Sequence, residues 1–163
     1  MESTPPSPFR LDPRAIPGNG MHLQGQTQPG FFGLPEGGEV IEGGPLHYDL
    51  RLEPDGSEVV VSGHLDTQFS LECGRCLERF PFGVEIPAWH HVAQPKDDQM
   101  IDLTDQVRED ILLALPSYPR CEHGNIDQRD CPAEGQFEKV EPVTFDETGS
   151  SKQTAWDTLD DLI

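Results

Sequence analysis

The chain has four cysteines, and their spacing is the sequence feature most able to support chemistry. Cys73 and Cys76 lie three positions apart in "SLECGRCLERF", with a glycine and an arginine between them. Cys121 and Cys131 follow much later, in "PRCEHGNIDQRDCPAEG". Such residues could form a redox pair, a metal site or disulfides, or could remain four separate reduced thiols.

The surroundings of the first pair favour a metal site. A catalytic Cys-x-x-Cys requires its first thiol at a helix N-terminus, whereas this pair lies between two predicted strands. A turn that contains glycine lets two thiolates converge on one ion, and structural zinc takes four ligands in a tetrahedron. We therefore expect a site, with zinc as the candidate ion, formed by Cys73, Cys76, Cys121 and Cys131. The second pair is spaced more widely than usual, so a histidine could substitute: the candidates are His90, His91 and His123.

Alternating apolar residues from position 46 onward predict the sheet that would position the first pair. "LHYDLRLE" places its apolar residues on one face, and the turn "EPDGSE" follows it. Further segments, "VVVSGHLD", "TQFSLEC" and "RFPFGVEI", repeat the alternation. Four short strands with short links predict an antiparallel meander that is buried on one face. The first cysteine pair would then lie at the tip between the third and fourth strands.

A single helix is predicted by "IDLTDQVREDILLALP". Its apolar residues recur every four positions as Leu103, Val107, Ile111 and Leu115. Asp102 can cap its first turn, and Pro116 stops it. The expected fold is therefore α+β: a curved antiparallel β-meander packed against one amphipathic helix.

The chain divides into three predicted regions. Residues 1–45 read as a flexible leader rich in proline and glycine, partly irregular, with a possible short strand at "RLDPRAI" or "EVIE". Residues 46–131 form the core domain with the cysteines. Residues 132–163 form an acidic tether and a short C-terminal helix that carries Trp156 and Leu159. That helix could pack back on the domain or dock on a partner, and the sequence leaves both open.

Charge and composition restrict the classes of function. The formal net charge is −19, and residues 101–163 contribute much of it. Such a surface repels nucleic acid and favours a basic protein partner or simply solubility. No apolar run approaches the roughly 18 residues of a membrane span, and no signal peptide is evident, so we expect a cytoplasmic, monomeric protein without a membrane role. No nucleophile with a paired base and no glycine-rich phosphate loop is present, so we do not expect an enzyme.

Two sequence blocks occur in this chain. The first is Cys-x-Arg-Cys-Leu-x-x-Phe, formed by Cys73, Arg75, Cys76, Leu77 and Phe80. The second is Asp-Leu…Glu-x-x-x-Leu-x-Leu-Pro, formed by Asp102, Leu103, Glu109, Leu113, Leu115 and Pro116. In this order, and with the terminal Trp-x-x-Leu, they resemble the YceD-like family of bacterial large-ribosomal-RNA-subunit accumulation proteins, over about residues 46–163. Many members carry a second cysteine pair in a tighter loop ending in Gly-Leu-Cys, from which "CEHGNIDQRDCPAEG" departs.

The resemblance implies a non-catalytic role in large-subunit ribosome biogenesis, with a precursor of that subunit as the partner. Contact would be made either with ribosomal RNA or with a basic ribosomal protein. We expect Arg75 and Arg79, as the bases near the hairpin tip, and Trp156 and Leu159, in the acidic tail, to make it. The alternatives are a zinc-stabilised protein-interaction adaptor without a ribosomal role and a thiol redox protein.

Overall fold

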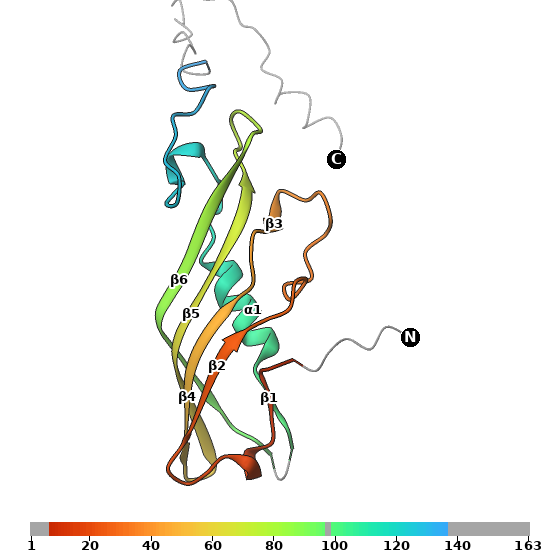
Figure 1. The fold of residues 1–163 in the computed structure, drawn as a ribbon, viewed down its shortest axis with the longest axis vertical. Coiled ribbons are helices and arrows are strands. Elements are labelled where there is room, and N and C mark those ends of the chain that lie inside the picture. Colours follow the sequence, from red (N-terminus) through yellow and green to blue (C-terminus); the bar gives the residue numbers. More distant parts are fainter. Residues whose placement is uncertain (1–6, 97–98, 137–163) are drawn as a thin grey trace, which may run out of the picture.

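The computed structural model describes residues 7–96 and 99–136 (Figure 1). Its strands are β1 (Arg10–Leu11), β2 (Met21–Gln26), β3 (Val40–Glu42), β4 (His47–Asp55), β5 (Glu58–Glu72), β6 (Arg79–Ala93) and β7 (Ile101–Asp102). Its helices are α1 (Thr104–Leu113) and two short 3-10 turns, η1 (Pro13–Ala15) and η2 (Cys121–His123). The predicted C-terminal helix lies outside the described residues.

Five of the strands form one antiparallel sheet that curls around α1, so the predicted α+β class is confirmed (Figure 1). The central strand is β5, which pairs with β6 along one edge. Its other edge pairs first with β4, up to Asp66, and then with β3, from Phe69 to Leu71. The outer strand β2 pairs with β4, and β1 and β7 form a separate two-stranded ribbon. The long β5–β6 hairpin carries the first cysteine pair at its tip.

The strands are longer and fewer in this hairpin than the sequence predicts. The second and third predicted strands are one strand, β5, because apolar residues stay on the buried face from Val59 to Leu71 without an intervening turn. Gly63 allows β4 to lie close to β5, since a Cβ at this position would collide with the backbone carbonyl of Asp49. Strand β6 continues to Ala93, past a register shift opposite Gly63 and Leu65. Before that shift even-numbered residues of β6 face the core, and after it odd-numbered residues do.

The N-terminal region is not a separate leader, which corrects the sequence prediction for its described part. The short strands expected at "RLDPRAI" and "EVIE" are present as β1 and β3. Strand β2 was not expected, and it pairs with β4 over six residues. Three aromatic or aliphatic side chains from this region are buried in the same core as the sheet: Phe9, Ile16 and Phe32.

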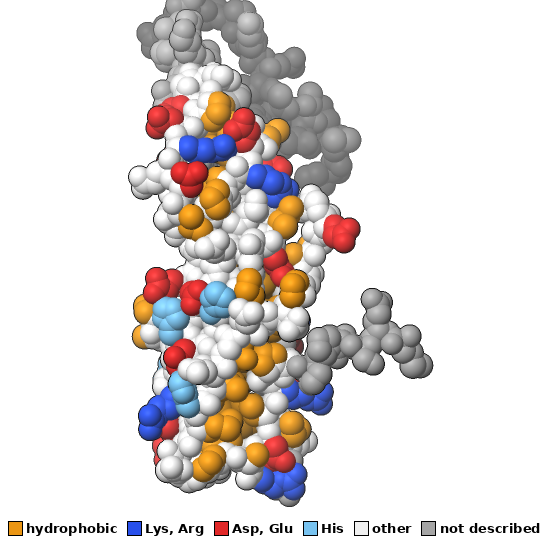
Figure 2. All heavy atoms as spheres, viewed as in Figure 1, with side chains coloured by type: hydrophobic (Ala, Val, Ile, Leu, Met, Phe, Trp, Pro, Cys, Tyr) orange, Lys and Arg blue, Asp and Glu red, His pale blue; other side chains and the backbone are white. Residues whose placement is uncertain are grey.

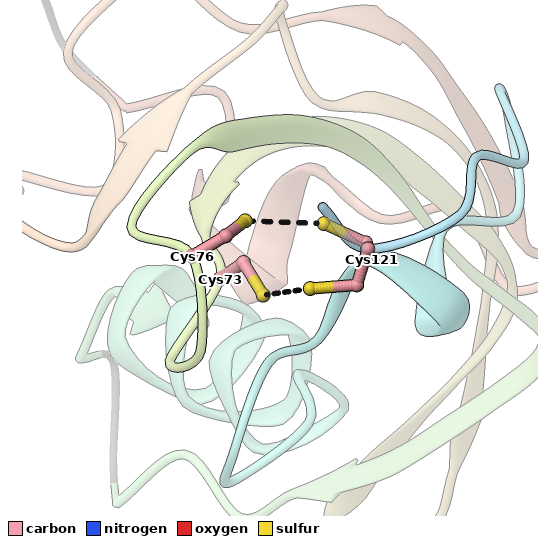
Figure 3. Close-up of side chains that lie close together, drawn as sticks. Cys73, Cys76 and Cys121 are labelled. Carbon is pink, nitrogen blue, oxygen red and sulfur yellow. Dashed lines mark hydrogen bonds between the residues drawn. The ribbon is translucent and has the colours of Figure 1, made fainter. Parts of the chain in front are cut away.

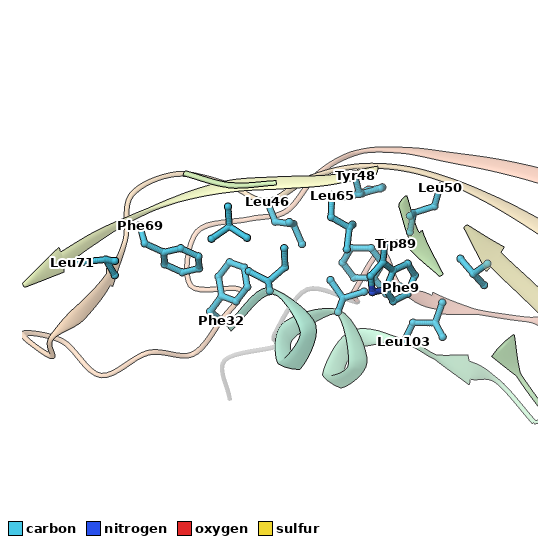
Figure 4. Packing of buried hydrophobic residues seen from close by; sticks show 14 of the residues in the cluster. Phe9, Phe32, Leu46, Tyr48, Leu50, Leu65, Phe69, Leu71, Trp89 and Leu103 are labelled. Atoms are coloured by element: carbon cyan, nitrogen blue, oxygen red, sulfur yellow. The ribbon is translucent and has the colours of Figure 1, made fainter. Parts of the chain in front are cut away.

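The predicted helix is confirmed as α1, and its apolar stripe faces the sheet (Figure 4). Leu103, Val107 and Ile111 are buried, while Leu115 is half-buried just beyond the helix. The N–H of Thr104 donates to the carboxylate of Asp102 at 3.0 Å, which satisfies an N–H group at the start of the helix. None of the helices in the described ranges is long and apolar enough to span a membrane.

Candidate metal centre

The first cysteine pair lies in a tight turn between β5 and β6. The N–H of Cys73 donates to the carbonyl of Glu78, and the N–H of Leu77 donates back to the carbonyl of Cys73, both at 2.9 Å. Leu77 is in the left-handed region, with φ of 61°. This turn directs the two thiols to the same side, and it does not begin a helix of the kind a catalytic Cys-x-x-Cys uses.

The second cysteine pair is brought to this turn by the segment that follows α1. The N–H of Gly74 donates to the carbonyl of Pro119 at 2.9 Å, and the Tyr118 hydroxyl donates to the carbonyl of Gly74 at 3.2 Å. Further along, the side chain of Asn125 bonds both backbone groups of Gly83 at 2.8 Å, as a neighbouring strand residue would. These hydrogen bonds hold residues 118–125 against the hairpin, and Cys121 lies in this segment.

The four sulfur atoms converge on one point (Figure 3). All four Sγ atoms lie within 4.8 Å of one another; the Cys76–Cys121 pair is 3.5 Å apart, and the Cys73–Cys131 pair is 3.9 Å apart. A tetrahedral zinc ion with bonds of about 2.3 Å requires sulfur atoms about 3.8 Å apart. The cysteines could therefore hold a metal ion with little rearrangement.

The candidate histidines do not join this group. Among the described residues, the cluster of potential metal ligands consists of the four cysteines alone. His123 follows Cys121 in η2, whereas His90 and His91 lie far along β6, where His91 stacks on Trp89. The wide spacing of the second cysteine pair is accommodated by the chain between them, so a substitute ligand is not required.

The thiols occupy unequal electrostatic environments. Burial raises the pKa of Cys73, but backbone N–H groups, among them those of Cys76 and Arg75, outweigh burial and lower that pKa to about 6. Burial raises the pKa of Cys121 to about 12, although Arg129 donates to its sulfur. A divalent ion would favour ionisation of all four thiols and release their protons.

Arg129 is a contributor to the site that the sequence reasoning missed. Its Nη2 lies 3.3 Å from Cys121 Sγ, and its Nη1 lies 3.0 Å from Glu78 Oε2. Four thiolates around a divalent cation carry two net negative charges, which this guanidinium would partly offset. The only sequence signal is a basic residue two positions before Cys131.

Replacing Arg129 with Met should weaken metal binding about 10- to 100-fold, the usual effect of removing a partner that contacts a metal ligand. Competition for the metal ion against a chromophoric chelator would measure the affinity of each protein. Arg120→Met is the matched control, because Arg120 pairs with Glu122 at 3.5 Å and touches no sulfur in the described contacts. Equal affinities of the wild type and the Arg129→Met variant would show that the guanidinium does not support the site.

The structure places the predicted binding arginines in contacts with the protein itself. Arg75 Nη1 lies 3.3 Å from Glu122 Oε2, and the Arg75 side chain is 25% exposed. Arg79 donates to the carbonyl of Gly38 at 2.6 Å. They are also not the only bases at this end, since Arg120 and Arg129 lie there too, which corrects the sequence prediction. The other predicted binding residues, Trp156 and Leu159, lie outside the described residues.

Comparisons with family models, curated proteins and solved structures gave no match to this chain. A shell of four thiolates leaves no coordination position for water or substrate, which is the form of structural metal sites. Cys73 and Cys121 are fully buried, and Cys131 is nearly so. The arrangement can tie the β5–β6 tip to the segment after α1, and it offers no open metal position for catalysis.

Proposed function

We propose that this protein binds zinc through its four cysteines and acts as a non-catalytic factor in accumulation of large-subunit ribosomal RNA. The observation that carries the proposal is where the four cysteines lie relative to the two sequence blocks that resemble the family. Cys73 and Cys76 come from the first block that resembles the YceD-like family, and Cys121 lies five residues beyond the Pro116 that ends the second. The first block thus supplies two of the four cysteines, and the second block ends just before the segment that supplies the other two.

Zinc is the ion that the donor set supports best. Soft thiolate ligands select zinc over magnesium, calcium or manganese, and four of them in a tetrahedron are typical of structural zinc. The closed shell supports a stabilising role, and the proposed function accordingly needs no reaction at the site.

Contact with the ribosomal precursor is better explained through a basic protein than through RNA. RNA binding draws on lysine and arginine side chains that reach phosphates, and this chain has 11 such residues against 30 acidic ones. Arg75 and Arg79 already have partners within the fold. The acidic C-terminal segment with Trp156 and Leu159 is a suitable ligand for a basic ribosomal protein, because its carboxylates would be attracted by a positive surface.

A strain that lacks this protein should contain less large subunit relative to small subunit, measured by sucrose-gradient sedimentation, and less large-subunit ribosomal RNA. The wild-type gene should restore both the subunit ratio and the amount of large-subunit ribosomal RNA. The gene for the Cys73→Ser, Cys121→Ser double variant should restore neither. Normal ratios in the deletion strain would reject the ribosomal function. A zinc-stabilised protein-interaction adaptor would then be the better explanation.

A further inference from the structure

Leu77, immediately after the first cysteine pair, combines two unfavourable features. Its backbone lies in the left-handed region at φ 61°, and among the described residues it is the one non-glycine with positive φ. Its side chain is 68% exposed, although it is a large aliphatic residue. The turn itself explains the backbone, because the N–H of Leu77 must return to the carbonyl of Cys73. The turn does not explain why the side chain at this position is a large, exposed aliphatic one.

Glycine or asparagine would satisfy the same turn at lower cost. Left-handed backbone is unfavourable for a residue with a Cβ, and glycine avoids this cost. An exposed leucine gains nothing from burial within its own chain. The fold therefore gives no reason for a leucine at this exposed, left-handed position, and contact with a molecule outside the chain would supply one.

The surroundings indicate which kind of partner would contact it. Tyr118, which bonds the same turn through Gly74, is also exposed, at 53%, and the guanidinium of Arg120 lies over its ring. Residues 72–80 and 118–131 contain five carboxylates and four arginines. Acidic and basic side chains are intermingled at this end of the molecule (Figure 2). Each of the four arginines is in an ion pair with a glutamate. Four thiolates around a divalent ion would carry a further net charge of −2.

We propose that Leu77 is an anchor that inserts into an apolar pocket on a basic protein. The fixed turn presents Leu77 rigidly, so little conformational entropy is lost when it is buried by a partner. The excess of negative charge around it favours a positive rim on the partner and disfavours phosphate. This inference rests on the proposed function in one respect: the basic protein is taken to be a component of the large ribosomal subunit.

Leu77→Gly tests the anchor, because it removes the side chain and keeps the turn. The probes are isolated large ribosomal subunits, the total protein extracted from them, and their protein-free ribosomal RNA. The variant should bind subunits and extracted protein at least about tenfold more weakly than the wild type, as expected for a central contact residue. Its melting temperature should be unchanged or raised, since strain is relieved. Leu113→Ala, at a leucine on α1 that is 74% exposed, is the matched control and should bind as the wild type does.

The outcomes separate this inference from the proposed function. If the wild type binds the protein extract and Leu77→Gly binds equally well, the anchor is rejected while the ribosomal function stands. If the wild type binds only the protein-free RNA, the anchor is also rejected, in favour of nucleic-acid contact. If the wild type binds none of the three probes, the anchor is again rejected, and the subunit ratios of the deletion strain decide the ribosomal function.

Discussion

Replacing Cys121 with Ser is expected to release the metal ion and to lower the melting temperature by roughly 10 °C or more. Binding of zinc to four-ligand structural sites contributes about 10 kcal/mol or more in small domains, so losing even a third of it would be a large effect. Cys121 is fully buried in the same core as Phe80 and Cys73, which couples the metal centre to the sheet. Thermal unfolding followed by circular dichroism would measure the change.

Treatment with a chelator provides the control for this variant. If metal loss is the cause, the chelator-treated wild type should melt close to the Cys121→Ser variant, and the variant should not respond to chelator. A Cys121→Ser protein that keeps its metal, or that melts within about 2 °C of the wild type, would contradict a stabilising role.

Truncating Ile111 to Ala is expected to reduce the free energy of unfolding by about 2–5 kcal/mol, the usual range for a buried aliphatic side chain. Ile111 is fully buried and belongs to the hydrophobic core. This core lies between α1 and the curled sheet (Figure 4). The alanine would leave a cavity that the surrounding strands can fill only in part. Urea denaturation of both proteins would give the difference.

The neighbouring leucine offers a control in the same helix. Leu113 is 74% exposed, so Leu113→Ala should change the free energy of unfolding by less than about 0.5 kcal/mol. Similar losses for Ile111→Ala and Leu113→Ala would mean that the helix does not present the face described here to the sheet.

The sequence predicted those parts of the fold in which periodicity and burial agree. Leu50 and Leu52 alternate with polar residues on β4, and Val107 and Ile111 recur at helical spacing on α1. Strand β2 was missed because "MHLQGQ" contains few apolar residues, and pairing with β4 holds it in place. Phe9 gave no signal either, since a single buried side chain in an irregular segment has no period.

The sequence predicts which residues form the candidate site, but it does not predict how the chain brings them together. Two cysteines three apart in a turn between predicted strands favour a metal ligand pair over a redox pair. The spacing of Cys121 and Cys131 does not reveal how their segment returns to the hairpin. That return depends on contacts distant in the sequence, such as the bonds between Asn125 and Gly83. Arg129 could not be assigned to the site for the same reason.

The metal content of the native protein is the most direct test of a zinc site formed by the four cysteines. Protein purified without chelator should contain about one zinc ion per chain by elemental analysis, since four thiolates complete a single tetrahedral shell. The Cys73→Ser, Cys121→Ser double variant, purified in parallel, should contain almost none. The four-cysteine metal site would be rejected by three results together. The wild-type protein would contain neither zinc nor another metal, its four thiols would react freely with a thiol reagent, and added zinc would leave its melting temperature unchanged.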